Sequence, residues 1–324
     1  MKVSAIIPFY NVSPFIERCA TALLEQTLEE VELIFVDDAS PDDSRSILGG
    51  VIAKHSDRNV RIVTHEVNKG LPAARNTGLA YATGEYVYHC DSDDWLEKDM
   101  LEEMYRAARE NDADIVYSDY YLSFAESERL MENPSFTSAD DLLKKGFLSG
   151  STKYNVWNKI ARRSLYTDNG ILFPSGHSMG EDMTMIMLAS NAKRVAHVAK
   201  GFYHYVKVNQ GAMTQTWSQR QLDDTRFNTD RVLEYVKGRL GAEEKKYLAF
   251  FKLNVKLPFL MSGDKSQYAL WRKWFPEADS YAMKNKALPF RVRMIQWLAA
   301  KEQFWLVTFY SWAIAKLYYG LKYK

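Results

Sequence analysis

The stretch "GLPAARNTGLAYATGEYVYHCDSDDW", residues 70–95, decides the fold class. Its first half favours a helix that Gly84 closes, and "EYVYHC" follows as a short, mostly apolar strand. Three aspartates, Asp91, Asp93 and Asp94, then stand within four positions. Because like charges this close repel one another, the aspartates either form a solvated turn or surround a positive group.

Strand and helix patterns alternate on both sides of this stretch, along the first 118 residues. Strands are expected at residues 2–9, 31–37, 60–66, 85–90 and 113–119, and helices at 14–26, 40–55, 70–84 and 96–111. Ser13 and Ser40 are the expected N-caps of the first two helices. This alternation predicts an α/β fold with a mostly parallel sheet flanked by helices on both faces.

The rest of the chain changes character twice. Residues 119–180 are less regular, and a helix at 181–191 and a strand at 194–208 follow them. From about residue 216 the pattern is helical. We therefore expect a catalytic domain at residues 1–215, made of a nucleotide-binding half at 1–118 and an acceptor-side half at 119–215, and a C-terminal helical region at 216–324.

The composition excludes several classes of protein. Apolar residues make up 47% of the 324 residues, which is ample for a core, and the net charge of +1 argues against a nucleic-acid partner. Cys19 and Cys90 are too few and too far apart for a disulfide framework or a zinc site. The N-terminus lacks a signal-peptide pattern, and no apolar run is long enough to span a bilayer. A cytoplasmic protein is expected.

Polar side chains follow three of the expected strands. In parallel sheets ligands bind at the carboxyl ends of the strands, so residues 8–11, 37–38 and 91–94 are expected at one edge. Asp37 and Asp38 suit either the N-terminus of a helix or hydrogen bonds from a nucleotide base or ribose. Residues 91–94 suit either a turn in which Asp94 caps the next helix, or hard oxygen ligands for Mg²⁺ or Mn²⁺.

The ordered set of motifs is more specific than any single one. "IIPFYN", "VDDASPDDS", the stretch at residues 70–95 and a later "GED" occur in this order on one alternating frame. This set resembles the family 2 glycosyltransferases, an inverting group with the GT-A fold, over residues 1 to about 210. The resemblance implies transfer of a sugar from a nucleotide-diphosphate donor, most simply a UDP-sugar, to a hydroxyl of a saccharide or lipid-linked acceptor. It also implies a role in capsule, O-antigen or exopolysaccharide assembly.

The resemblance implies roles for residues on the donor side. Pro8 and Tyr10 lie in the loop that wraps the nucleotide, and Asp38 matches the position that contacts uracil. Arg75 matches a position near the base and diphosphate. Asp91 and Asp93 match the metal motif D-x-D, with Asp93 as the direct ligand of Mn²⁺ or Mg²⁺ and Asp91 facing ribose or metal-bound water.

On the acceptor side, the resemblance makes Asp182 of "GED" the general base, with Glu181 beside it in the substrate site. Trp157 and Lys159 of "VWNKI" match a motif near the acceptor.

The sequence leaves the roles of two histidines open. His204 is either a late metal ligand, as in some family members, or a packed residue of an aromatic strand. His177 lies beside the "GED" loop, where an acceptor contact is conceivable.

The chemistry fits these assignments. A divalent ion stabilises the negative charge of a departing diphosphate, and an inverting displacement needs one base for the acceptor hydroxyl. Without the other motifs, Glu181 and Asp182 would be read as an acid pair at a helix N-terminus. A glycoside hydrolase also uses two carboxylates but needs no nucleotide-type sheet. A phosphoryl-transfer enzyme predicts a phosphate-binding loop that "PFYNVSP" lacks. A catalytically silent nucleotide-sugar-binding scaffold protein is the remaining alternative.

The C-terminal tail is basic and aromatic. Residues 284–324 contain eight basic residues and one acidic residue, Glu302. Residues 304–315 carry no charge but are too few to span a bilayer. Two interpretations stay open: a helix that packs on the protein or against a second copy in a homodimer, or an interfacial helix on the inner face of the cell membrane.

Overall fold

The computed structural model describes residues 1–207, 218–261 and 266–313. The chain divides into two compact units, Met1–Leu142 with Tyr154–Val232, and Leu143–Lys153 with Leu233–Lys324. This division differs from the expected one at residue 215 in two segments: residues 143–153 belong to the second unit, and residues 218–232 belong to the first. Asn254 and Asn285 donate to the carbonyls of Leu148 and Ser149 in the second unit, and side chains of the helix after residue 218 hold the first unit.

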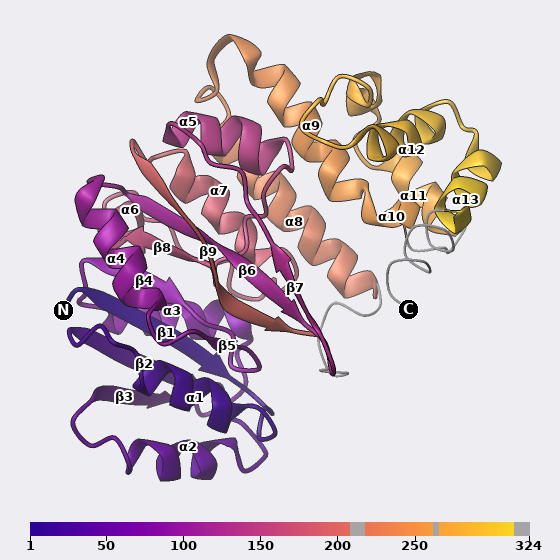
Figure 1. The fold of residues 1–324 in the computed structure, drawn as a ribbon. Coiled ribbons are helices and arrows are strands. Elements are labelled where there is room, and N and C mark those ends of the chain that lie inside the picture. Colours follow the sequence, from indigo (N-terminus) through magenta and orange to yellow (C-terminus); the bar gives the residue numbers. More distant parts are fainter. Residues whose placement is uncertain (208–217, 262–265, 314–324) are drawn as a thin grey trace. The chain divides into compact units, whose positions relative to one another are not determined.

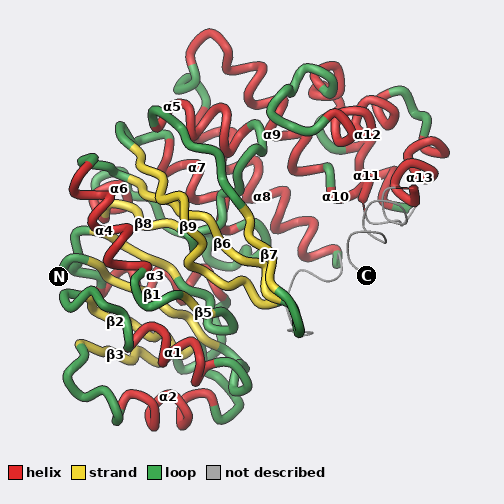
Figure 2. Tube along the Cα trace, viewed as in Figure 1, coloured by secondary structure: helices red, strands yellow, loops and turns green. Residues whose placement is uncertain are grey.

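The first unit is built on one sheet. Within the described residues its strands are β1 (Val3–Phe9), β2 (Val31–Asp37), β3 (Asn59–Thr64), β4 (Tyr86–His89), β5 (Trp95–Leu96), β6 (Ile115–Ser123), β7 (Glu128–Met131), β8 (Lys159–Arg162) and β9 (Val195–Val206). Their order is β3-β2-β1-β4-β8-β6-β9-β5, with β7 beside β6. Figure 2 shows how the sheet curls, and Figure 1 shows helices on both of its faces.

The predicted α/β fold with a mostly parallel sheet is confirmed, and β6 and β9 are one of the parallel pairs. Strands β3, β2, β1 and β4 are parallel neighbours. Strand β8 then runs antiparallel between β4 and β6, and β5 and β7 are also antiparallel to their partners. The four residues "KIAR" are too few to indicate which strands they pair with or in which direction they run. The insertion of β8 between β4 and β6 could therefore not be predicted from the sequence.

The helices of the first unit are α1 (Ile16–Leu24), α2 (Ser44–Ile52), α3 (Leu71–Tyr81), α4 (Met100–Glu110), α5 (Ala139–Asp141), α6 (Arg163–Thr167), α7 (Thr184–Ala189) and most of α8 (Gln219–Val236). A 3₁₀ turn, Glu181–Met183, precedes α7, and a π-helical segment, Leu142–Leu148, follows α5. The second unit contains α9 (Glu244–Lys256), α10 (Pro258–Met261), α11 (Gln267–Lys273), α12 (Phe290–Ala300) and α13 (Phe304–Ala313), with 3₁₀ turns at Gly241–Glu243 and Pro276–Tyr281.

The predicted N-caps were wrong. Helix α1 starts after Phe15 and α2 after Asp43, and neither has a side-chain cap. The backbone N–H of Ser13 donates to Asp42 (2.8 Å). The hydroxyl of Ser40 accepts from the N–H of Asn11 (2.8 Å) and donates to Asp42 (2.7 Å). These bonds tie the loop after β1 to the loop after β2, which fixes the edge of the sheet where the site lies.

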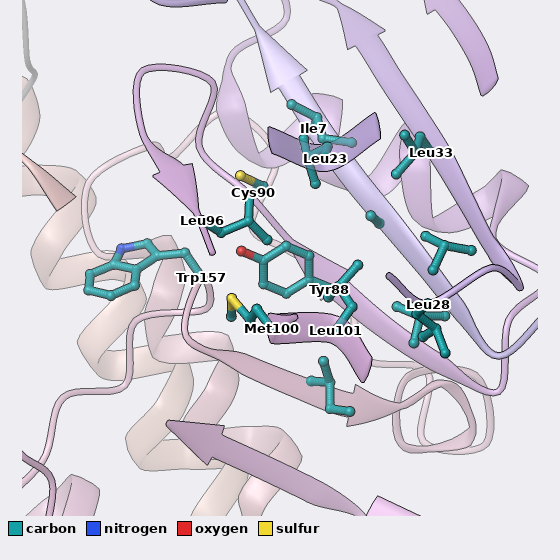
Figure 3. Packing of buried hydrophobic residues seen from close by; sticks show 14 of the residues in the cluster. Ile7, Leu23, Leu28, Leu33, Tyr88, Cys90, Leu96, Met100, Leu101 and Trp157 are labelled. Carbon is teal, nitrogen blue, oxygen red and sulfur yellow. The ribbon is translucent and has the colours of Figure 1, made fainter. Parts of the chain in front are cut away.

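Side chains along β1 alternate between the two faces of the sheet, and each face is packed against helices. Val3, Ala5 and Ile7 belong to the core that α1 and α4 cover, and Figure 3 shows this core around Tyr88, Leu96 and Met100. Ile6 points to the other face, where α3 approaches so closely that a Cβ on Gly78 would lie 2.3 Å from Cγ2 of Ile6. Every residue of β1 and β2 is buried, as expected for central strands of a covered sheet.

The second unit is held by a buried lysine. The ammonium of Lys256 donates to the carbonyls of Trp271 (3.3 Å) and Trp274 (2.9 Å) at the end of α11 and pairs with Asp279. It also lies over the ring of Trp271, which supplies a cation–π contact. No helix among the described residues combines the length and the apolar character needed to cross a bilayer.

Candidate donor and catalytic site

The three predicted clusters meet at one edge of the sheet. Phe9 of β1 lies opposite Asp37 of β2, and the N–H of Asp38 donates to the carbonyl of Phe9 (3.1 Å). The N–H of Cys90 donates to Ile6, which brings the end of β4 beside β1 (3.0 Å). Pro8 is buried in β1, while Tyr10 is exposed in the loop that follows.

Asp38 shapes the loop that enters α3. Its Oδ1 accepts hydrogen bonds from Nδ1 of His65 (2.6 Å) and the N–H of Lys69 (2.8 Å). Its Oδ2 accepts from the N–H of Gly70 (2.8 Å), whose φ of 85° requires glycine. The nucleotide-binding role of Asp38 stays a prediction, and the structure adds His65 as the residue that orients it. Nothing in the sequence had marked His65.

Arg75 lies at the centre of the site. Its side chain is 1% exposed, and its Nη2 donates to Oδ1 of Asp91 (2.8 Å). Its Nη1 donates to Oδ1 of Asp182 (2.8 Å) and to Oε1 of Glu181 (3.2 Å). One guanidinium therefore joins Asp91 of the acidic motif after β4 to Asp182 of the "GED" motif, 91 positions later in the sequence. The sequence placed Arg75 near the donor but did not identify these partners.

The electrostatics of this cluster separate two adjacent carboxyl groups. Burial, reinforced by the charge of Asp182, raises the pKa of Glu181 to about 8, although Arg75 opposes the shift. Burial also raises the pKa of Asp182, while Arg75 lowers it through both its charge and its hydrogen bond. Glu181 is therefore the group that holds a proton near neutral pH. Asp182 faces the guanidinium and is better placed to accept one.

The acidic motif after β4 divides into two parts. Asp94 is buried: its Oδ2 accepts from the Tyr203 hydroxyl (2.7 Å) and its Oδ1 from the N–H of Val206 (2.7 Å). The alternative in which Asp94 caps the next helix is excluded, because β5 intervenes and α4 begins only after Asp99. Asp91 and Asp93 remain partly exposed at the edge of the sheet.

The exposed pair fits a divalent ion that substrate phosphates help to hold. No three His, Cys, Asp or Glu side chains converge as a complete metal site in the part of the chain that the structure describes. Mg²⁺ in phosphate chemistry is commonly held by only one or two carboxylates together with phosphate oxygens and water. Asp91 and Asp93 supply that number of carboxylates where a ligand would lie.

His204 has the packed environment that one of the two interpretations describes. Its ring is stacked against Trp95, with centroids 3.5 Å apart, and against Tyr121 at 4.7 Å. Its Nδ1 lies 2.7 Å from Oε1 of Glu128 and its Nε2 lies 3.1 Å from Oε1 of Glu97. A metal would have to displace one of these contacts, so the structure favours packing over metal binding.

The "VWNKI" motif lies deeper than an acceptor contact would suggest. Trp157 is buried and stacked on Tyr203 at 4.5 Å between centroids. The ammonium of Lys159 donates to the carbonyl of Asn155 (2.8 Å) and to Oδ1 of Asn158 (2.7 Å). Burial lowers the pKa of Lys159 to about 7, against the opposing charge of Asp182. Lys159 therefore belongs to the electrostatic environment of Asp182.

Helix α8 holds the segment in front of Asp182. The buried Asp224 accepts from Nδ1 of His177 (3.1 Å) and from the N–H of Ser178 (3.1 Å). One turn later, Asn228 donates to the carbonyls of His177 (3.2 Å) and Met179 (3.0 Å). The ring of His177 also stacks on Phe227 of α8, with centroids 3.7 Å apart. Helix α8 therefore holds His177 in place, and the acceptor contact expected of His177 stays a prediction. Apart from polar residues spaced by four in α8, nothing in the sequence indicated the contact between α8 and the segment in front of Asp182.

Comparisons with known proteins show what this chain is similar to. A family model described as Glycosyl transferase family 2 matches residues 4–183. "Uncharacterized glycosyltransferase EpsJ" of Bacillus subtilis is 33% identical over 232 residues, which cover 68% of this chain and 65% of that protein. "Cholesterol galactosyltransferase" of Borreliella burgdorferi is 30% identical over 310 residues, which cover 89% of this chain and 84% of that protein. The chain spans two thirds or less of the length of several curated relatives.

A solved structure supports the fold. The crystal structure of S. aureus TarS in complex with UDP-GlcNAc has a TM-score of 0.70 and 23% identity, and the match covers 97% of this chain and 91% of that chain. This likeness confirms the predicted GT-A fold. Together with the family match over more than half of the sequence, it leaves one assignment: the chain belongs to glycosyltransferase family 2.

Proposed function

We propose that this chain is a metal-dependent inverting glycosyltransferase. It moves a sugar from a nucleotide-diphosphate donor, most simply a UDP-sugar, to a hydroxyl of a saccharide or lipid-linked acceptor. One observation carries the proposal: Arg75 bonds both Asp91, of the metal motif, and Asp182, the base candidate. This arrangement would bring a metal-bound diphosphate at Asp91 and a base at Asp182 to the same donor sugar.

The donor side would bind at the edge of the sheet. Asp38, fixed by His65 and the backbone of residues 69–70, would accept from the base, with Pro8 and Tyr10 lining the loop. A Mg²⁺ or Mn²⁺ ion held by Asp91 and Asp93, when bound, stabilises the charge of the departing diphosphate. Arg75, already bonded to Asp91, would orient that carboxylate.

The acceptor side would use Asp182. Its carboxylate, which accepts a hydrogen bond from Arg75, would accept the proton of the acceptor hydroxyl as this oxygen attacks the anomeric carbon and the bond to diphosphate breaks. Glu181, which holds its own proton near neutral pH, would contact the acceptor rather than act as the base. Trp157 and Lys159, which are buried, would support the acceptor site from the interior of the protein.

Relatives narrow the substrates further. The similar structure of TarS is a complex with UDP-GlcNAc, which supports a UDP-sugar donor for this chain. A similar protein is a cholesterol galactosyltransferase, which supports a lipid-like acceptor. We infer a role in cell-surface polysaccharide assembly, at the inner face of the cell membrane.

The test is calorimetric titration of UDP and UDP-GlcNAc into the purified protein with Mn²⁺, with Mg²⁺ and with EDTA. We expect binding that requires the metal and that Asp93→Ala removes. Binding that persists unchanged in EDTA would overturn the metal assignment. If none of UDP, UDP-GlcNAc, GDP and TDP binds under any of these conditions, the proposal of a transferase loses its main support.

A further inference from the structure

The last two described helices combine aromatic and basic residues. Residues 284–313 contain Glu302 and five basic residues: Lys284, Lys286, Arg291, Arg293 and Lys301. Helices α12 and α13 pack against each other within the second unit (Figure 1). This feature has no part in the proposed chemistry.

Helix α13 has one packed side and one open side. Phe304 stacks on Tyr268 with centroids 5.0 Å apart, and the hydroxyl of Thr308 lies 3.1 Å from that of Tyr268. On the open side Trp305 is 69% exposed and Phe309 is 62% exposed. These two residues are four positions apart, so they are neighbours on the helix surface. One side of α13 is thus packed on the protein, as one interpretation of the tail expects. The other side is exposed, as the interfacial interpretation expects.

Helix α12 repeats this arrangement. Phe290 is 56% exposed and Trp297 is 40% exposed, and their spacing of seven places them on one side of the helix. Exposed Lys301 follows Trp297 by one turn, at the end of α12. Large aromatic residues gathered in this way on a surface mark an interaction site more often than a solvated face.

The charge around these aromatic residues selects the partner. The single acidic residue, Glu302, is paired with Arg272 (2.9 Å), so the basic residues of the region are not neutralised by it. In a symmetric dimer the same basic residues would face one another, which disfavours a second copy as the partner. Exposed Trp and Phe beside Lys and Arg are what an anionic lipid surface binds.

We propose that the exposed aromatic residues of these helices, Phe290 and Trp297 of α12 with Trp305 and Phe309 of α13, dock on an anionic lipid surface. The ten residues of α13 extend only about 15 Å, half of a bilayer's hydrocarbon core, so docking is peripheral. Aromatic side chains enter the headgroup layer, and the basic residues meet lipid phosphate. This inference does not depend on the proposed transfer reaction, and its failure would leave that reaction untouched.

The test is flotation of the full chain with vesicles of phosphatidylcholine alone and of phosphatidylcholine with phosphatidylglycerol. We expect binding to the anionic vesicles that weakens as salt is added. Replacing both aromatic residues of α13, Trp305→Ser with Phe309→Ser, should lower the partition coefficient at least about tenfold. Phe124→Ser removes an exposed aromatic residue of the first unit and should change nothing.

A second variant, which changes charge and no aromatic residue, tests the proposal in case the serine variant misfolds. Lys286→Glu with Lys301→Glu changes exposed side chains without touching the packed side of α13, and it should also weaken binding. Equal binding to neutral and anionic vesicles, or parent-like binding by both variants, overturns the proposal. So does a parent dimer, seen by light scattering, that the Trp305 and Phe309 changes convert to a monomer, because a second copy would then cover this face.

Discussion

Arg75 and Asp182 lie 107 positions apart in sequence and 2.8 Å apart in space. The guanidinium is buried, and its other nitrogen bonds Asp91 at the same distance. The two motifs that define the candidate site are therefore not independent: each carboxylate is oriented by a cation that the other shares.

The first prediction concerns this shared cation. Arg75→Met leaves the carboxylates of Asp91 and Asp182 without the cation that they share, which should destabilise the fold by about 3–5 kcal/mol. Urea unfolding measures the effect. Arg45→Met is the matched control, because Arg45 is half exposed and lies 3.6 Å from Asp37, so its loss should cost less than about 1 kcal/mol. Equal effects from both variants would show that the buried network does not stabilise the protein.

The second prediction separates the adjacent carboxyl groups. Asp182→Asn should keep UDP binding and lose roughly 10²–10⁴-fold in the transfer rate, because the base is gone. Glu181→Gln should keep most of the rate at pH 7, because glutamine resembles the protonated acid that a pKa of about 8 implies. Single-turnover assays with the donor identified by titration measure both. A normal rate in Asp182→Asn shows that the base lies elsewhere.

The third prediction is a pH dependence of stability. The pKa of Glu181 is raised from 4.5 to about 8, so the folded protein keeps a proton that the unfolded chain releases between these values. Stability from this group must therefore fall as pH rises from about 4.5 to about 8 and stay constant above. Glu181→Gln removes the contribution, so its melting temperature relative to the parent should rise across that window. A constant difference at all pH values would mean that Glu181 titrates normally.

Several of these features could be predicted from the sequence and others could not. The acids that end β2 and β4 were placed correctly at one edge, because buried strands and the direction of a parallel sheet fix where each strand ends. The partners of Asp94 were not predictable, since they lie on β9 more than a hundred positions later. The N-caps failed because Ser40 bonds a neighbouring loop instead of its own helix.

The fourth prediction divides the acidic motif by function. Asp93→Ala should abolish metal-dependent UDP binding and lower the unfolding free energy less than Asp94→Ala does, because the Asp93 side chain is partly exposed and Asp94 is buried. Asp94→Ala should destabilise by about 1–3 kcal/mol, since it leaves the Tyr203 hydroxyl and the Val206 N–H without their acceptor. Titration and urea unfolding of both variants check the division. The opposite pattern would exchange the two roles.

The fifth prediction concerns the hold of α8 on the segment before Asp182. Asp224→Ala removes the acceptor of His177 and Ser178, so that segment should shift and move Asp182 from its place beside Arg75. A shift of about 1 Å can cost up to about 10²-fold in rate, so kcat should fall while the donor KM stays constant. Asp223→Ala is the matched control, because this exposed neighbour accepts from Gln219 of the same helix. If Asp224→Ala raises the donor KM and leaves kcat unchanged, α8 supports the donor site instead of the base.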